Sequence, residues 1–173
     1  MTDLYTDGGL LSRNPSSLGC TAAFVAVREG LVIEQMAWRM TCEDLGLSEV
    51  SSNTAELLAA IFALRWIGIE QPGWAGKLHT DSEVTATRLR RGQVGLRWDM
   101  RGVTSRMNTW FRLAMAKVGK FEVIELGGHP TRADLAAGVN KYGLPVSRWN
   151  VLADKLCNRV KEVDRPLENL IGV

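Results

Sequence analysis

The feature that most restricts the fold is a long helical segment, residues 51–68, lying between a β-rich N-terminal part and a short predicted strand at Lys77–Thr80. A strand that follows such a helix after an earlier strand completes a βαβ unit, whose two strands run parallel in one sheet. The helix carries apolar side chains over a broad face, so we predict that it is largely buried against that sheet. The chain is therefore predicted to be an α/β protein.

The remaining segments define the predicted sheet. Three strands are predicted before the long helix, at residues 4–9, 20–28 and 31–40. The turn signal Glu29-Gly30 indicates that they form an antiparallel meander. After Lys77–Thr80 we predict a helix of about ten residues, then a helix, an edge strand and a last helix at 103–118, 121–126 and 149–163. The order predicts a mixed five-stranded sheet with strands 1–3 antiparallel, strands 4 and 5 parallel, helices on both faces, and long loops at 41–50 and 131–147.

Length and composition indicate one domain. The chain has 173 residues, 46% of them hydrophobic, which is enough for one core. We assign residues 1–163 to this domain and 164–173 to a tail. No apolar run approaches the roughly 18 residues of a membrane span, and the first residues do not resemble a signal peptide. We therefore expect a cytoplasmic monomer without a membrane partner. Cys20, Cys42 and Cys157 form no Cys-x-x-Cys pair and are expected to be reduced thiols in or near the core.

The formal net charge of +2 conceals an asymmetry along the chain. Residues 1–70 carry a net charge of −5, whereas residues 88–117 contain eight arginine and lysine residues against the single acid Asp99. A basic run of this density attracts polyanions such as nucleic acid. A solvated helical face is an equally good interpretation of a basic run.

Four carboxylates lie at positions that the predicted elements bring together. Asp7 ends the first strand and Asp81 ends the fourth, so the two stand side by side if these strands pair. Glu56 lies in the long helix and Asp154 in the last one. Carboxylate oxygens are the ligands that Mg²⁺ prefers. Two such ions about 4 Å apart activate water and stabilise the leaving oxygen in phosphodiester cleavage.

Two of these acids also have purely structural interpretations. Glu56 follows Asn53 at the spacing of a helix capping box. Asp81 stands where a helix N-cap is expected, although a capping residue can also be a metal ligand. The two glycines after Asp7, Gly8 and Gly9, remove side chains where a bulky partner is expected to come close.

Short motifs surround these acids and follow one another in a characteristic order: Thr6-Asp7-Gly8, Asn53-Thr54-Ala55-Glu56-Leu57, His79-Thr80-Asp81-Ser82, Gly128-His129 and Asn150 to Asp154. Each is weak alone, but their order and the elements that carry them resemble type 1 ribonuclease H over about residues 1–163. The resemblance implies a ribonuclease H-like fold. It also implies an endonuclease that cleaves the RNA strand of RNA-DNA hybrids with two Mg²⁺ ions, for which Mn²⁺ substitutes, leaving 5′-phosphate and 3′-hydroxyl ends.

The resemblance also implies roles for individual residues. Asp7 is expected to bridge both ions, Asp154 to hold the ion that activates water, and Glu56 and Asp81 to hold the ion at the leaving 3′-oxygen. His129 matches the loop histidine that assists proton movement or product departure. A lone histidine before proline is otherwise an ordinary surface residue.

Six residues are predicted to bind substrate: Asn14, Ser51, Asn53, Arg88, Arg91 and Trp98. Asn53 matches the asparagine that reads the minor groove of the hybrid, where 2′-hydroxyls distinguish RNA from DNA. Asn14 and Ser51 resemble contacts to the substrate backbone, although turn or cap roles fit equally. The two arginines and Trp98 are expected to bind the DNA strand. Trp98 is equally consistent with a core residue.

Two departures from the family pattern leave alternatives open. Glu83 stands where the family commonly has a glutamine that contacts substrate, and a carboxylate there repels phosphate. The loop 131–147 is longer than usual after the histidine, and its Arg132, Lys141 and the following Arg148 would let it close over substrate. The alternatives are another nuclease of this fold that acts on DNA, and a catalytically silent module that binds hybrids.

Overall fold

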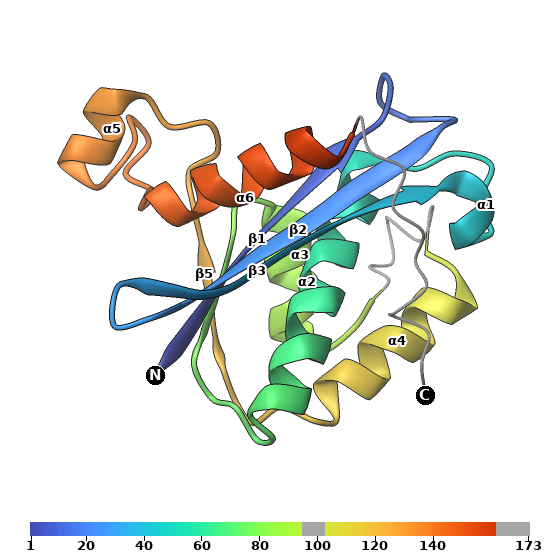
Figure 1. Cartoon of the computed structure of the whole chain (residues 1–173), viewed down its shortest axis with the longest axis horizontal. Helices are drawn as coiled ribbons and strands as arrows, with labels where there is room; N and C mark the ends of the chain where they lie inside the picture. Colours follow the sequence, from blue (N-terminus) through green and yellow to red (C-terminus); the bar gives the residue numbers. More distant parts are fainter. Residues whose placement is uncertain (95–102, 162–173) are drawn as a thin grey trace.

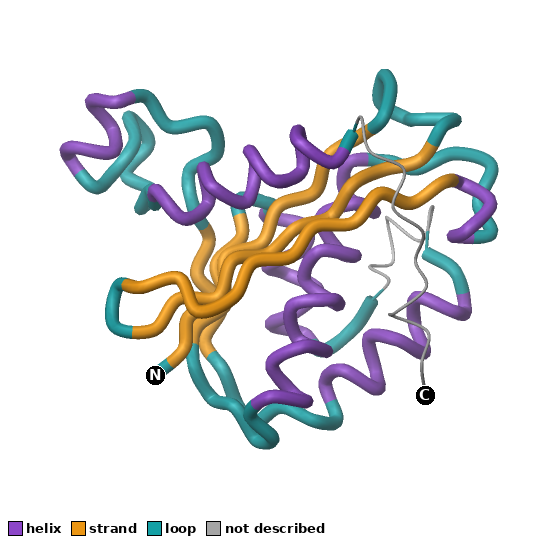
Figure 2. Tube along the Cα trace, viewed as in Figure 1, coloured by secondary structure: helices purple, strands orange, loops and turns teal. Residues whose placement is uncertain are grey.

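A computed structural model describes residues 1–94 and 103–161 and shows a central sheet between two layers of helices (Figures 1 and 2). The strands are β1 Thr2–Leu10, β2 Gly19–Arg28, β3 Leu31–Thr41, β4 Lys77–Thr80 and β5 Glu122–Glu125. The helices are α1 Cys42–Leu45, α2 Ser52–Glu70, α3 Glu83–Arg91, α4 Ser105–Met115, α5 Arg132–Ala137 and α6 Arg148–Val160. None of these helices is both long and apolar enough to cross a membrane.

The sheet has the strand order β3-β2-β1-β4-β5. The first three strands are antiparallel neighbours, and β4 runs parallel to both β1 and β5. Thr6 of β1 lies opposite Thr80 of β4. Asp7 and Asp81 each follow one of these paired residues, so they stand at the same edge of the sheet. The predicted mixed five-stranded sheet is confirmed.

Helices cover both faces of the sheet, as predicted. Helix α2 packs on one face together with α4, and its apolar residues are buried on nearly every side of the helix. Helix α6 packs on the other face against β1, β2 and β3. Strand β2 therefore has both sides covered, and its residues from Gly19 to Val27 are all buried. The free thiols of Cys20, Cys42 and Cys157 are buried in this interior, as predicted.

Two segments predicted as loops contain short helices. Thr41 is the N-cap of α1 and Thr131 is the N-cap of α5, and each forms a capping box with the aspartate three residues later. Each helix ends at a glycine in the left-handed conformation. Local capping is what makes such short helices possible, because a helix of four to six residues has little intrinsic stability.

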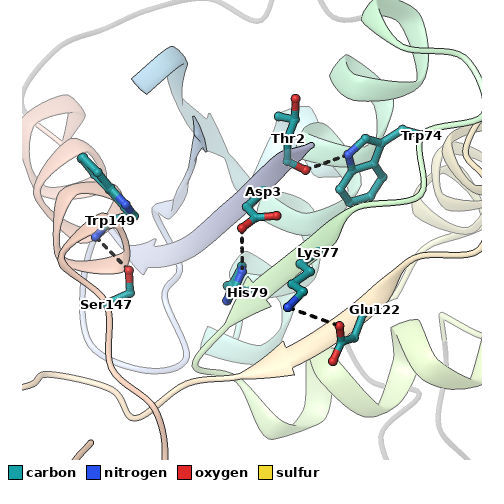
Figure 3. Close-up of polar contacts among 8 residues, drawn as sticks. All are labelled: Thr2, Asp3, Trp74, Lys77, His79, Glu122, Ser147 and Trp149. Carbon is teal, nitrogen blue, oxygen red and sulfur yellow. Dashed lines mark hydrogen bonds and ion pairs between the residues drawn. The ribbon is translucent and has the colours of Figure 1, made fainter. Parts of the chain in front are cut away.

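Cross-strand contacts hold the amino ends of the parallel strands together (Figure 3). The indole Nε1 of Trp74 donates a hydrogen bond of 2.9 Å to the carbonyl oxygen of Thr2. Lys77 in β4 forms an ion pair of 3.6 Å with Glu122 in β5. The four acids lie at the other end of these strands or on the helices that pack there.

Candidate active site

Three of the four predicted acids meet where β1 and β4 end. Asp7 lies in β1, Asp81 follows β4 directly, and Glu56 lies in the second turn of α2. One carboxylate oxygen from each of the three lies within 4.8 Å of the other two. Residues that lie 25 to 74 positions apart in the chain thus place three carboxyl groups at one point.

A glycine allows this close approach. A Cβ atom on Gly8 would overlap the backbone of Ala55 and Glu56 and would lie 2.7 Å from the carbonyl oxygen of Ala55. The close approach predicted at Gly8 is therefore made by helix α2 itself. Without a side chain at this position, β1 and α2 can touch, and Glu56 reaches Asp7.

The capping interpretations of Glu56 and Asp81 do not match the structure. Helix α2 begins after Ser51, whose hydroxyl accepts a hydrogen bond from the backbone N–H of Thr54, 3.2 Å away. Helix α3 begins after Ser82, whose hydroxyl accepts from the N–H of Thr85 at 3.2 Å. Serines therefore cap both helices, and the two carboxylates face the site instead.

Burial and mutual repulsion make these carboxylates difficult to ionise. Burial, together with the charges of Asp81 and Asp154, raises the pKa of Asp7 to about 7. Burial also raises the pKa of Glu56 well above its usual value, with Asp7 and Asp81 adding to the effect. The pKa of Asp81 is raised by burial, although a hydrogen bond of 3.2 Å from the Asn150 amide opposes the rise. A bound cation would relieve this repulsion.

One atom at the site fits a metal ligand particularly well. Among the described residues, the buried Oε2 of Glu56 has no hydrogen-bond partner. A buried carboxylate oxygen left in this state is costly. Hard divalent cations bind oxygen donors of this kind. The donor set formed by Asp7, Glu56 and Asp81 therefore fits such an ion.

The acids open onto a cleft of about 260 Å³ that is lined by Asp7, Asp81, His129, Pro130, Asn150, Val151 and Asp154. Asp154 lies outside the group of three oxygens but in the same cleft, and the side-chain amide of Asn158 donates to its Oδ1 at 3.2 Å. His129 is exposed at the rim with a φ of 47°, a rare value for a residue other than glycine. The fold thus brings both residues to the site at which they were expected.

The predicted substrate residues Asn14, Ser51 and Asn53 form a polar group at the start of α2, the helix that carries Glu56. Asn14 is exposed, and its side-chain amide donates to the hydroxyl of Ser52 at 3.2 Å. Asn53 is half-buried in the first turn of α2. Ser51 is the N-cap of α2, which confirms the capping role that was the alternative interpretation of this residue. Its role in substrate binding, like those of Asn14 and Asn53, stays a prediction.

The basic residues of the α3 region divide into two kinds. Arg88 is only 1% exposed, and its Nη1 donates to the backbone oxygen of Asn53 at 3.3 Å. Because this guanidinium is buried in the protein, the predicted direct contact of Arg88 with substrate is corrected to a structural contact with the start of α2. Arg91 is exposed at the carboxyl end of α3, and its contact with substrate stays a prediction. Glu83 is exposed at the amino end of the same helix. Trp98 lies outside the described residues.

One residue of the site was missed by sequence reasoning. Asn150 is 3% exposed and holds the carboxylate of Asp81 through its side-chain amide. The signal was its position four residues before Asp154, because residues at this spacing share one face of a helix. A buried polar side chain facing a charged group positions that group.

Comparison with known proteins gives matches to solved structures only. No family model matches the chain, and no curated protein sequence matches it. The ribonuclease H1 of the halophilic archaeon Halobacterium salinarum NRC-1 is 20% identical, with 91% of this chain and 95% of that chain covered and a TM-score of 0.59.

Two further solved structures are also similar to this chain. LC11 ribonuclease H1, solved in complex with an RNA/DNA hybrid, is 18% identical over 92% of this chain and 95% of its own, with a TM-score of 0.59. The N-terminal ribonuclease H domain of a Mycobacterium tuberculosis protein, solved as a fusion with maltose-binding protein, is 14% identical over 93% of each chain, with a TM-score of 0.62. The chain therefore has a type 1 ribonuclease H-like fold.

Proposed function

We propose that this protein is an endonuclease that cleaves the RNA strand of RNA-DNA hybrids and leaves 5′-phosphate and 3′-hydroxyl ends. The observation that carries the proposal is the group of carboxylate oxygens from Asp7, Glu56 and Asp81, within 4.8 Å of one another at the sheet edge. Asp154 and His129 line the same cleft. The hybrid bound to LC11 ribonuclease H1, which shares the fold, supports the substrate class.

The proposed cofactor is a pair of Mg²⁺ ions, with Mn²⁺ as a substitute. Asp7 would contact both ions, Asp154 the ion on the side of the attacking water, and Glu56 and Asp81 the ion on the side of the leaving oxygen. When bound, such ions supply water activation and stabilisation of the charge that develops on the phosphate. The orphan Oε2 of Glu56 and the raised pKa of Asp7 support a cation in this position.

The chain's own residues hold this arrangement in place. The amide of Asn150 orients Asp81, and the amide of Asn158 orients Asp154. Both amides come from α6, so one helix positions two of the carboxylates that line the cleft. His129 stands at the exposed rim, where its ring can exchange a proton with departing product.

Selection of a hybrid is assigned to the start of α2. Asn53 and Asn14 present side-chain amides there, and amides can donate to and accept from 2′-hydroxyls in the minor groove. The buried guanidinium of Arg88 fixes the backbone of Asn53 through its carbonyl oxygen. Helix α3 thereby sets the position of the residue proposed to read the sugar.

Cleavage of an end-labelled RNA strand tests the proposal. The strand is supplied paired with DNA, paired with RNA, or alone, in Mg²⁺, in Mn²⁺ and with chelator. We expect cleavage of the hybrid only, in either metal, with loss in chelator. Cleavage of duplex DNA would identify a DNA nuclease instead. Binding of the hybrid without turnover in either metal would identify a silent binding module.

A further inference from the structure

The segment between the cleft and α6, residues 131–148, forms a separate lobe. It leaves the sheet directly after His129 and Pro130, which line the cleft, and it contains α5. Figure 1 shows α5 projecting beyond the edge of the sheet, next to the start of α6. No role in the proposed chemistry uses this lobe.

The lobe is an ordered structure with a defined base. The Oδ1 of Asn140 accepts hydrogen bonds from the backbone N–H groups of Tyr142 and Leu144, at 2.9 and 3.1 Å. The N–H of Gly127 donates to the carbonyl oxygen of Pro145 at 2.8 Å. Because Gly127 lies two residues before His129, the base of the lobe is joined to the wall of the cleft. The backbone of the lobe is therefore anchored next to the wall of the cleft.

The charged surface of the lobe is basic. Arg132, Lys141 and Arg148 are all exposed. The one acid between residues 131 and 148 is Asp134, whose carboxylate completes the capping box of α5 by accepting from the N–H and the hydroxyl of Thr131 at 2.8 and 2.7 Å. Three cations thus face solvent beside a cleft whose own charges are negative.

An aromatic ring accompanies these cations. Tyr142 is 76% exposed, and the Nζ of Lys141 lies 4.9 Å from the centre of its ring. The guanidinium of Arg148 lies 4.1 Å from the ring centre of Trp149, which limits its freedom to rotate. Exposed cations that neutralise phosphates, together with a ring that stacks on a base or sugar, are the combination that binds nucleic acid backbones.

We propose that the lobe of residues 131–148 is a nucleic-acid-binding surface that contacts the backbone of the duplex beside the phosphodiester held in the cleft. This inference rests on the proposed function, because the ligand is the hybrid substrate itself. In the part of the chain that the structure describes, the lining of the cleft contains aspartates but no lysine or arginine that could bind the phosphates of the duplex. Cations on the lobe supply attraction a short distance away and so position the substrate without entering the site.

Affinity for a hybrid, measured by fluorescence anisotropy at several salt concentrations, tests the inference. The parent is Asp7→Asn, which keeps the hybrid intact during the measurement. Lys141→Ala is compared with Lys120→Ala, a control that removes another exposed lysine near the amino ends of β4 and β5. Circular dichroism checks that each variant remains folded.

We expect Lys141→Ala to weaken binding by about 3- to 10-fold at low salt and to reduce the slope of log Kd against log salt by about 1. The double change Arg132→Ala with Lys141→Ala should reduce the slope by about 2. Tyr142→Ala should weaken binding by about tenfold while leaving the slope unchanged, since stacking releases no counterions. Lys120→Ala should behave as the parent does.

Two results would overturn the inference, and they are distinguishable. If the parent binds the hybrid but Lys141→Ala and Tyr142→Ala match Lys120→Ala in affinity and slope, the lobe does not contact nucleic acid and the proposed function still stands. If the parent binds no hybrid at any salt concentration and the wild type cleaves none, the proposed function fails and the inference fails with it.

Discussion

The two ends of the parallel strands differ in the charges that neighbour one another. At the amino ends, Lys77 of β4 pairs with Glu122 of β5, so opposite charges neighbour each other (Figure 3). At the carboxyl ends, Asp7, Glu56 and Asp81 bring three carboxylate oxygens within 4.8 Å of one another. Crowding of like charges costs free energy in the protein alone. The difference therefore supports the proposal that a cation binds at the carboxyl end.

The two ends also differ in how burial acts on titratable groups. Nearer the amino ends, the carboxylate of Asp3 lies 3.9 Å from the Nε2 of His79, which stands in the middle of the paired strands, opposite Tyr5. Burial lowers the pKa of His79 to about 4, so the ring is neutral at pH 7 and this approach is not an ion pair there. At the carboxyl end, burial raises the pKa of Asp7 to about 7. Burial thus favours the neutral form of both groups, because it lowers the pKa of the histidine and raises the pKa of the aspartate.

The largest expected effect compares the two aspartates of β1. Asp7→Asn should lower the rate of hybrid cleavage by about 10³-fold or more, because it removes the carboxylate proposed to contact both metal ions. Asp3→Asn, at the other end of the strand, should leave the rate within about twofold of the wild type. Single-turnover cleavage measures both. Comparable losses in the two variants would show that the ends do not differ in function.

The next effect concerns the close approach of β1 and α2. Gly8→Ala should reduce the free energy of unfolding by about 3 kcal/mol or more, because its Cβ would overlap the backbone of Ala55 and Glu56. Gly30→Ala is the control, since its Cβ would meet nothing within 4 Å. Its positive φ should cost about 1 kcal/mol. Urea denaturation compares the two, and equal losses would rule out the overlap as the cause.

The third effect is the pH dependence that originates at His79. The pKa of His79 is lowered to about 4 in the folded protein, against about 6.5 when unfolded. The unfolded chain therefore binds more protons between these values. Stability from this group is complete above about pH 6.5 and is lost as the pH falls toward 4, by about 2 to 3 kcal/mol.

His79→Phe isolates this contribution, because the ring that stacks on Tyr5 at 4.2 Å is replaced by one that cannot titrate. Denaturation at intervals between about pH 4 and 7 should show a shallower loss in the variant than in the wild type. Identical pH profiles would mean that His79 titrates alike in the folded and unfolded chains. Asp7 should act in the opposite direction in metal-free protein, where its raised pKa removes stability as the pH rises toward 7.

The smallest effect belongs to the exposed ion pair. The side chains of Lys77 and Glu122 are 47% and 60% exposed, so solvent screens their attraction. A double-mutant cycle with Lys77→Ala and Glu122→Ala should give a coupling energy of about 0.2 to 1 kcal/mol. Neither variant should alter cleavage. A coupling energy above about 2 kcal/mol would show that charge interactions matter as much at the amino ends of the strands as at the carboxyl ends.

Much of the fold follows from the sequence because its patterns are local and regular. The long apolar helix and the strand after it require a parallel pair, and that pair alone places Asp7 beside Asp81. The two short helices were not predicted, although Thr131 and Asp134 carry the signal of a capping box. Four to six residues are too few for hydrophobic periodicity to show.

The site was less predictable than the fold. The acids could be named from the motifs around them, but the position of Arg88 could not. In the sequence it belongs to a basic run, whereas in the structure it is buried and bonded to the backbone of Asn53. Which face of a short helix turns inward is decided by tertiary packing. Asn150 was missed for a related reason, since its partner Asp81 lies 69 residues away.

Thermal unfolding with and without Mn²⁺ tests most directly the claim that the carboxyl end is a cation site. In metal-free solution near pH 8, Asp7→Asn should be more stable than the wild type, because it removes one of the mutually repelling charges. Added Mn²⁺ should raise the Tm of the wild type by about 5 °C and that of Asp7→Asn by much less. A wild-type Tm that millimolar Mn²⁺ does not change, with Asp7→Asn no more stable than the wild type, would contradict the account.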